Sequence, residues 1–260
     1  MTKRVTTTTA ATAAYRAQWQ VLTYWWRQIP ERSWDEPSAI DGWRVGDLIA
    51  HFGLVADTIV AAAEAVTREP ALAVSDYVMS YAEVADGIDA RTREVGGDRS
   101  TTLAVVAELA AKADECLGSA ISDDPVVAAR RGPIRWSDFL ATRCIELAVH
   151  SDDLRRSVPD ASPAIERSCE KLAVRTLAAV LEVRAPGRSV EVRIPPYAAI
   201  QCVAGPWHTR GTPAAVVEMS PTTFLRIAAG RVSWAKVRSD GDIRASGERA
   251  DLQELLPLLS

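Results

Sequence analysis

The spacing of hydrophobic residues changes near position 158 of the chain. Before that point they recur every three or four residues in long runs, such as Tyr15, Trp19 and Leu22, which is the period of a helix. After it, short stretches alternate apolar and polar side chains, which is the period of a half-buried strand. The sequence therefore predicts an α+β protein, with a helical bundle over residues 1–158 and a small α+β domain over residues 159–260.

Proline and glycine mark the ends of the helices expected in the first part. Pro30, Pro70 and the Gly132-Pro133 pair each interrupt a helical pattern. Because the loops between the patterns are short, neighbouring helices are expected to pack as a bundle. The expected helices cover about residues 12–29, 43–67, 75–93, 101–118 and 137–157.

Two Ser-Pro pairs predict helix starts in the second part, since serine is a favoured N-cap and proline suits the first helical position. They are Ser162-Pro163, opening a helix to about 183, and Ser220-Pro221, opening a helix that ends at Gly230. Another helix is expected over 250–258. Strands are expected over 190–194, 198–203, 214–219 and 242–245.

The overall composition limits the classes of partner. The chain has 260 residues, a net charge of -4 and 30 scattered basic residues. No basic stripe with interleaved aromatic residues is present, so we expect no nucleic-acid partner. No apolar run reaches the roughly 20 residues of a membrane span, and no apolar segment follows the N-terminus as in a signal peptide. We therefore expect a cytoplasmic protein.

The cysteines are too dispersed for a disulfide framework or a zinc finger. Cys116, Cys144, Cys169 and Cys202 form no CxxC pair. They are expected to be small buried side chains.

Two of the three histidines stand where they could hold a metal ion. Glu146 and His150 are four residues apart on an expected helix, so both side chains lie on one face. His51 lies on the apolar face of the helix over 43–67. If these two helices pack together, His51, Glu146 and His150 form a His2Glu set with an open fourth position. The competing interpretations are a surface Glu-His pair and an isolated core histidine.

Other polar residues have less defined roles. Asp153, three residues after His150, either orients that ligand or continues a polar face. In the second part, Arg210 is a candidate for binding a carboxylate, in a loop that also carries His208. Arg231 is a second candidate anion-binding residue. The alternatives are a surface turn for the loop and helix capping for Arg231.

Two motifs carry a family resemblance. The segment Trp-x-Val-x-Asp-Leu-x-x-His, from Trp43 to His51, resembles the second-helix signature of DinB-like metal-binding bundles. The segment from Arg143 through Glu146 and His150 to Asp153-Leu154 resembles the later helix of the mycothiol-dependent maleylpyruvate isomerase branch. The second part, including 203–213 and 224–231, is similar to an actinobacterial group described as sterol carrier family proteins.

The resemblance implies a ligand set and a reaction. It places a divalent ion, by default Zn²⁺, on His51, Glu146 and His150, and mycothiol as a thiol cosubstrate. It implies a metal- and thiol-dependent isomerase or S-transferase acting on a small electrophilic, carboxylate-bearing substrate. Arg210 and Arg231 are then candidate catalytic residues, and His208 and Arg210 candidate cofactor-binding residues.

Two functions of other classes remain open at this point. The second domain could carry a lipid or sterol while the metal is structural. Alternatively, the bundle could bind metal without catalysing a reaction. An open metal site facing a polar cleft would favour the enzyme, and a closed metal site with an apolar cavity would favour the carrier.

Overall fold

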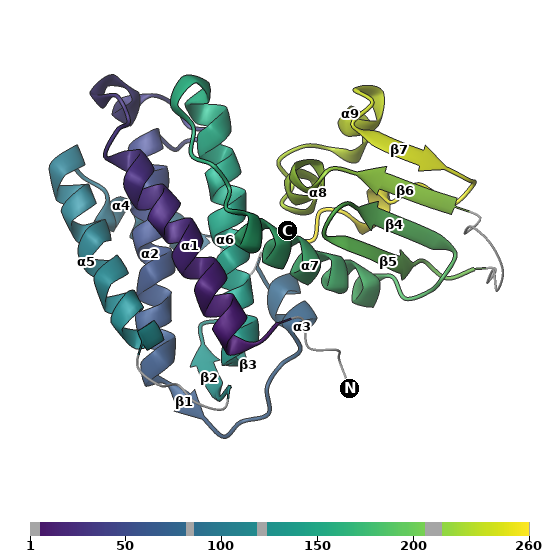
Figure 1. Ribbon diagram of the computed structural model, residues 1–260, viewed down its shortest axis with the longest axis horizontal. Helices are drawn as coiled ribbons and strands as arrows, with labels where there is room; N and C mark the ends of the chain where they lie inside the picture. Colours follow the sequence, from purple (N-terminus) through teal and green to yellow (C-terminus); the bar gives the residue numbers. More distant parts are fainter. Residues whose placement is uncertain (1–5, 82–85, 119–123, 206–214, 260) are drawn as a thin grey trace.

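The computed structural model shows a helical bundle joined to a small α+β domain, and it describes residues 6–81, 86–118, 124–205 and 215–259 (Figure 1). The helices are α1 (Thr8–Trp26), α2 (Val45–Glu64), α3 (Val74–Met79), α4 (Asp86–Val95), α5 (Arg99–Gly118), α6 (Trp136–Ser157), α7 (Arg167–Arg184), α8 (Pro221–Ala228) and α9 (Trp234–Ser239). Short 3-10 turns cover Glu31–Asp35, Pro159–Ala161 and Gln253–Leu255.

The strands form two separate sheets. In the bundle part, β1 (Val66–Thr67), β2 (Val126–Ala129) and β3 (Gly132–Arg135) make a small antiparallel sheet. In the C-terminal part, β4 (Val190–Ile194), β5 (Ala198–Cys202), β6 (Ala215–Met219) and β7 (Ile243–Ser246) form a sheet in the order β5-β4-β6-β7. In that sheet β4 pairs in parallel with β6, and the other two pairings are antiparallel.

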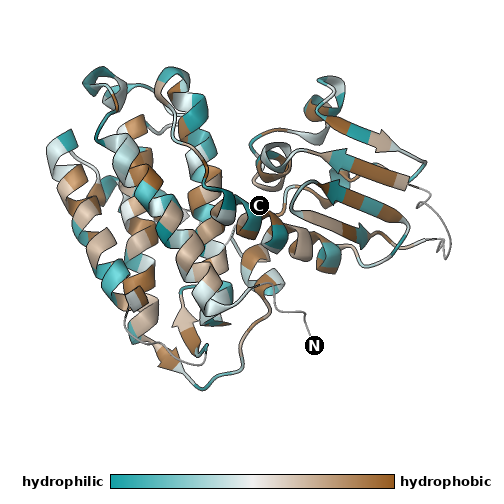
Figure 2. Ribbon diagram, in the orientation of Figure 1, coloured by the Kyte–Doolittle hydropathy of each residue, from teal (hydrophilic) through white to brown (hydrophobic). Residues whose placement is uncertain are grey.

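Amphipathic helices build the core of the bundle, where α2 packs against α5 and α6, and α1 packs against α6 (Figure 2). The helix α2 is apolar and long enough to cross a membrane by length and composition, yet 67% of its most apolar stretch is buried inside the protein. A central bundle helix has this character because it is covered on several sides.

The C-terminal sheet follows the alternation of its sequence. Val190, Val192 and Ile194 of β4 are buried, whereas Glu191 and Arg193 point the other way and are partly exposed. The helix α7 contacts β5 and α8, and on its other side it contacts α6 and α1 of the bundle. One helix therefore joins the two cores, and it lies between them in Figure 1.

The chain between α2 and α5 differs from expectation. One helix was expected over 75–93, but α3 ends at Met79 and α4 is a separate helix. The reason is that α3 packs on α6 and α7, whereas α4 packs on α2. A single straight helix could not reach both surfaces.

The hairpin of β2 and β3 was not expected at all. Gly132-Pro133 was interpreted as a helix break, but Gly132 begins β3, with φ of +120°, directly after the turn at Arg130-Arg131. A Cβ at this glycine would lie 2.8 Å from Cδ1 of Leu72, so a side chain would meet both strain and close packing.

Two other helix boundaries were also wrong. The helix predicted to start at Ser162-Pro163 begins instead at Arg167, where the Glu166 carboxylate accepts from the backbone N–H groups of Ser168 and Cys169. The helix expected over 250–258 is only a 3-10 turn at Gln253–Leu255. Pro257 cannot donate a helical hydrogen bond.

Gln18 explains why the chain stays extended before α7. This side chain is fully buried in α1. Its Nε2 donates to Ser151 Oγ and to the Ala164 carbonyl, both at 3.1 Å, and its Oε1 accepts from the Glu166 N–H at 2.5 Å. One amide therefore ties α1 to α6 and to the segment between α6 and α7.

We expect Gln18→Ala to lower the free energy of unfolding by about 2 kcal/mol, because it leaves buried partners without hydrogen bonds. Chemical denaturation followed by circular dichroism measures this loss. Gln20→Ala, at an exposed position of the same helix, is the matched control and should change stability by less than about 0.5 kcal/mol. Equal losses in the two variants would contradict the bridging role.

Candidate metal centre and its pockets

The three expected metal ligands meet inside the bundle. His51 comes from α2, and Glu146 and His150 come from α6. Glu146 Oε2 lies 3.5 Å from His51 Nε2 and 3.3 Å from His150 Nε2. One ligand atom from each residue lies within 4.8 Å of the others. The packing of α2 on α6 thus confirms that these three side chains come together.

The donor set suits a divalent cation. Two imidazoles and one carboxylate form a mixed set that Zn²⁺ binds well, with a fourth position left for another ligand. His51 is only 6% exposed, and its Nδ1 has no hydrogen-bond partner among the described residues. A buried imidazole with so few partners is costly unless another group binds it. A cation held by the three side chains would bind this ring through Nε2, the nitrogen that faces Glu146.

A buried carboxylate fixes the orientation of His150. Asp153 is 0% exposed, and its Oδ2 lies 2.9 Å from His150 Nδ1. An ionised carboxylate can only accept, so Nδ1 carries the proton and the lone pair of Nε2 would be available to a bound cation. This is the carboxylate–histidine–metal arrangement that orients ligands in many metal sites. The interpretation of Asp153 as part of a polar face is therefore wrong.

Charges around the triad set its protonation. Burial alone would raise the pKa of Glu146, but hydrogen bonds with His150 and His51 and the charge of Arg143 hold that pKa well below its usual range. Burial lowers the pKa of His51. At His150 burial is outweighed by hydrogen bonds to Asp153 and Glu146, and the pKa is raised. Protons therefore compete with a metal ion mainly at His150.

Two arginines of the C-terminal domain reach the end of α6. Arg231 donates through Nε to Asp153 Oδ1 at 3.0 Å. Arg226 donates to the two oxygens of Asp152 at 2.6 and 2.9 Å. Both aspartates are buried, so these ion pairs join the two parts of the protein. Arg231 also donates through Nη1 to the Ala229 carbonyl at the C-terminal end of α8, at 3.3 Å, so the expected capping occurs together with the ion pair. His208 and Arg210 lie outside the described residues.

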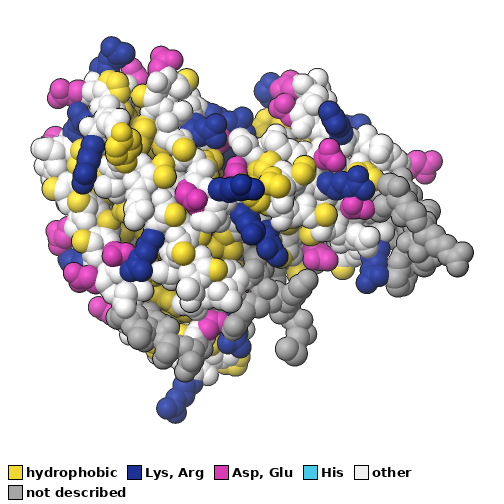
Figure 3. Space-filling model, viewed as in Figure 1, with side chains coloured by type: hydrophobic (Ala, Val, Ile, Leu, Met, Phe, Trp, Pro, Cys, Tyr) yellow, Lys and Arg dark blue, Asp and Glu magenta, His cyan; other side chains and the backbone are white. Residues whose placement is uncertain are grey.

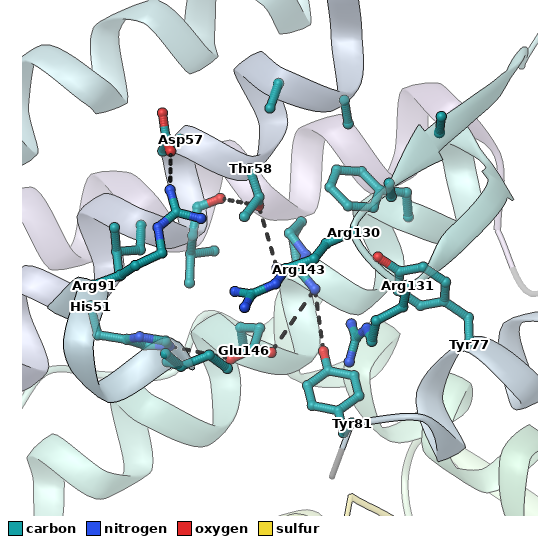
Figure 4. Close-up of a pocket in the computed structure, with 18 residues that line it drawn as sticks. His51, Asp57, Thr58, Tyr77, Tyr81, Arg91, Arg130, Arg131, Arg143 and Glu146 are labelled. Carbon is teal, nitrogen blue, oxygen red and sulfur yellow. Dashed lines mark hydrogen bonds and ion pairs between the residues drawn. The ribbon is translucent and has the colours of Figure 1, made fainter. Parts of the chain in front are cut away.

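Cavities lie on both sides of the triad. The larger, of about 550 Å³, is bordered by α2, α3, α4, α6 and the β2–β3 hairpin, and we call it the arginine pocket because Arg91, Arg130, Arg131 and Arg143 line it (Figure 4). The smaller, of about 280 Å³, includes Trp43, Arg231 and Leu259, and we call it the junction pocket. His51 and Glu146 line both, so the metal centre is reached from two directions.

Sequence reasoning missed most of the arginine pocket. Arg143 stands three residues before Glu146 in the same motif, which was the one available signal. Tyr81, Arg130 and Arg131 lie in segments whose structure was not expected, and nothing in their spacing pointed to Glu146.

Fold and site together define a class: a helical bundle with a buried His2Glu centre, followed by an α+β domain. The family model described as the mycothiol maleylpyruvate isomerase N-terminal domain matches residues 15–155, and the model described as bacterial SCP ortholog matches residues 166–258. Since the first covers more than half of the chain, the protein belongs to the mycothiol maleylpyruvate isomerase N-terminal domain family. The expected family and the α+β fold class are confirmed.

Solved structures agree with this fold. The crystal structures of the mycothiol-dependent maleylpyruvate isomerase and of its histidine-to-alanine mutant each match with a TM-score of 0.59 and 16% identity, covering 93% of this chain and 93% of theirs. No curated protein matches the chain. At this identity the likeness concerns the fold.

We expect the purified, untagged protein to hold about one equivalent of a divalent ion, because three buried ligands converge. Elemental analysis of wild type beside a His51→Ala, His150→Ala double variant measures this, and the double variant should hold none. His208→Ala, which changes the remaining histidine, is the control and should keep the ion. A wild-type protein that stays free of metal after incubation with zinc would contradict the site.

Asp153→Asn should weaken metal binding about 10- to 100-fold, because the ligand His150 loses its orienting carboxylate. In wild type the affinity should also fall as the pH is lowered, since protons compete at the raised pKa of His150. Competition with a chromophoric chelator measures both effects. Asp152→Asn, at the adjacent buried aspartate that pairs with Arg226, should leave the affinity unchanged. Equal losses in both variants would mean that the helix end, not the ligand, had been disturbed.

Proposed function

We propose that this protein is a metal-dependent enzyme that uses mycothiol as cosubstrate, and that in the cytoplasm it either isomerises a small electrophilic acid or adds the thiol to it as an S-transferase. The observation that carries the proposal is the buried triad of His51, Glu146 and His150, with a pocket open on each side. Family membership supports the choice of thiol. Zinc is the proposed ion, held by those three side chains.

A bound divalent ion would act as a Lewis acid and lower the pKa of a thiol at its open position. The chain itself holds the ligands in place: Asp153 fixes the ring of His150, and Glu146 remains ionised beside both histidines. The two imidazoles lie mostly in the protein interior, since His51 and His150 are at most 8% exposed. Charge interactions are stronger in such a site than in solvent.

Tyr81 is the proposed hydrogen-bond donor to the substrate. Its hydroxyl accepts from Arg143 Nη2 at 3.3 Å, and burial raises the pKa of Tyr81 to about 12. The hydroxyl therefore keeps its proton at neutral pH and can donate it to an oxygen of a bound ligand. Tyr81 lines both pockets, so this donor is available on either side of the metal centre.

In the proposed reaction the thiolate sulfur adds to an electrophilic alkene carbon, and the electron pair of the double bond moves toward the substrate carbonyl. In an isomerase the adduct rotates about the new single bond, the C–S bond breaks, and the thiolate leaves with the double bond restored. In a transferase a proton is added to the neighbouring carbon, and the thioether is the product. Neither outcome needs an oxidant or a reductant.

The C-terminal domain would contribute arginine to the substrate side. Arg231 lines the junction pocket while it pairs with Asp153, which places its guanidinium beside the metal centre. Arg210 remains a proposed carboxylate-binding residue, and His208 and Arg210 remain proposed contacts to the thiol.

The packing of the C-terminal domain does not favour a lipid carrier. The inner residues of its sheet, including Val192, Cys202 and Val217, are 0% exposed and belong to its own core. A shallow groove on this domain is lined by Arg193, Tyr197, Glu218 and neighbouring prolines and alanines. On the face in Figure 3, acidic and uncharged surface separates the described Lys and Arg side chains, which does not suit a nucleic acid either.

Zinc-loaded protein incubated with mycothiol and maleylpyruvate should give either the geometric isomer or a thioether adduct, and chromatography with mass detection distinguishes the two. Removing the metal, or His51→Ala with His150→Ala, should abolish the reaction, since no ion would activate the thiol. Glutathione in place of mycothiol tests the choice of thiol. Zinc-loaded protein that forms neither product would favour a metal-binding bundle without catalysis.

A further inference from the structure

The arginine pocket contains more positive charge than its own carboxylates neutralise. Four guanidinium groups line it, against the carboxylates of Asp57 and Glu146, a formal excess of two positive charges. Arg91 pairs with Asp57 at 3.0 Å, and Glu146 belongs to the metal set. The other three arginines are left to face the cavity.

Arg143 is a buried cation with mostly neutral partners. It is 6% exposed, and its guanidinium donates to the hydroxyl oxygens of Tyr81, Thr58 and Thr142 at 3.2 to 3.4 Å. The nearest carboxylate oxygen recorded for it is Oε1 of Glu146, at 3.9 Å. A buried charge is costly without close compensation, and an anion in the cavity would provide it.

Arg131 is stacked against two tyrosine rings and hydrogen-bonds to one of them, Tyr81. Its Cζ lies 3.4 Å from the ring centroid of Tyr81 and 4.3 Å from that of Tyr77. Stacking occupies the flat faces of a guanidinium, whereas its N–H groups point outward in the plane and can bind a carboxylate through two hydrogen bonds. Among the described residues, neither Arg131 nor Arg130 has a carboxylate partner.

These groups form a continuous path to the metal centre. Tyr81 touches both Arg131 and Arg143, and Arg143 lies beside Glu146 (Figure 4). The remaining wall is largely apolar and includes Leu54, Val55, Ala61, Ala62 and Phe139. An organic acid whose carboxylate binds the arginines would therefore place its apolar part along this wall, pointing toward the triad.

We propose that the arginine pocket binds the carboxylate of a small unsaturated acid through Arg131 and Arg143, and so selects the electrophile from within the bundle. Arg130, exposed at the tip of the hairpin, lies at the rim. Placing this acid as the electrophile rests on the proposed function, but its binding does not require the thiol or any turnover. Inorganic phosphate fits less well, because the apolar wall offers it nothing.

The test compares sorbate with its neutral amide, sorbamide, by titration calorimetry without thiol. The zinc-loaded protein should bind sorbate at least tenfold more tightly than sorbamide. Arg131→Gln should raise the dissociation constant for sorbate about tenfold or more, and should leave that for sorbamide unchanged. Arg135→Gln, an exposed arginine of the same hairpin outside the pocket, is the matched control and should change neither.

Several outcomes would overturn the proposal. The first is equal affinity for sorbate and sorbamide. The second is an affinity for sorbate that Arg131→Gln leaves unchanged, which is expected if the carboxylate binds only the metal. The third is tighter binding of inorganic phosphate than of sorbate. Arg143→Lys, which keeps the charge but loses the planar fork, provides a second variant, and circular dichroism melting establishes that each variant is folded.

Failure of this proposal is distinguishable from failure of the proposed function. If sorbate binds as expected and maleylpyruvate does not react, the pocket stands and the reaction is wrong. If maleylpyruvate reacts but Arg131→Gln leaves its KM unchanged, the reaction stands and the pocket does not select the acid.

Discussion

One buried carboxylate, that of Asp153, links the candidate metal site to the attachment of the C-terminal domain. Asp153 contacts a candidate metal ligand of its own helix, His150, and two cations, Arg156 and Arg231. Since Arg231 comes from the C-terminal domain, the orientation of His150 and the attachment of that domain involve the same carboxylate. A buried aspartate with several cationic partners stays ionised, and its pKa is held far below its usual range. Loss of the domain would thus leave Asp153 with fewer partners and the ligand less firmly held.

The sequence was sufficient for features that depend on local periodicity. The spacing of four between Glu146 and His150 fixes their common face on any helix, and the apolar stripe of α2 carries His51 into the bundle. The alternation in β4 likewise determines which residues face the sheet core. For these elements the intrinsic pattern and the tertiary packing agree, so the prediction needed no knowledge of distant contacts.

The features that sequence reasoning missed depend on distant partners. Gln18 in α1 holds residues 164 to 166 extended, so α7 starts later than its Ser-Pro signal indicates. The helix expected over 75–93 is divided because its two ends pack on different helices. The sequence alone could not decide between the two interpretations of Asp153, because its partner Arg231 lies 78 positions away. The pattern of residues within a short segment of the sequence contains no information about such distant contacts.

The β2–β3 hairpin places part of the proposed ligand-binding pocket on a different element from the candidate metal site. The candidate metal ligands sit on two long central helices, where a change of backbone would disturb the whole core. Arg130 and Arg131 sit on a turn between two four-residue strands, beyond Val127 and Ile134, which anchor the hairpin in the core. Within such a scaffold, substitutions at the turn would change which ligand is accepted while leaving the helices that hold the metal intact. Diversification of substrate range among proteins built this way would then concentrate in the hairpin.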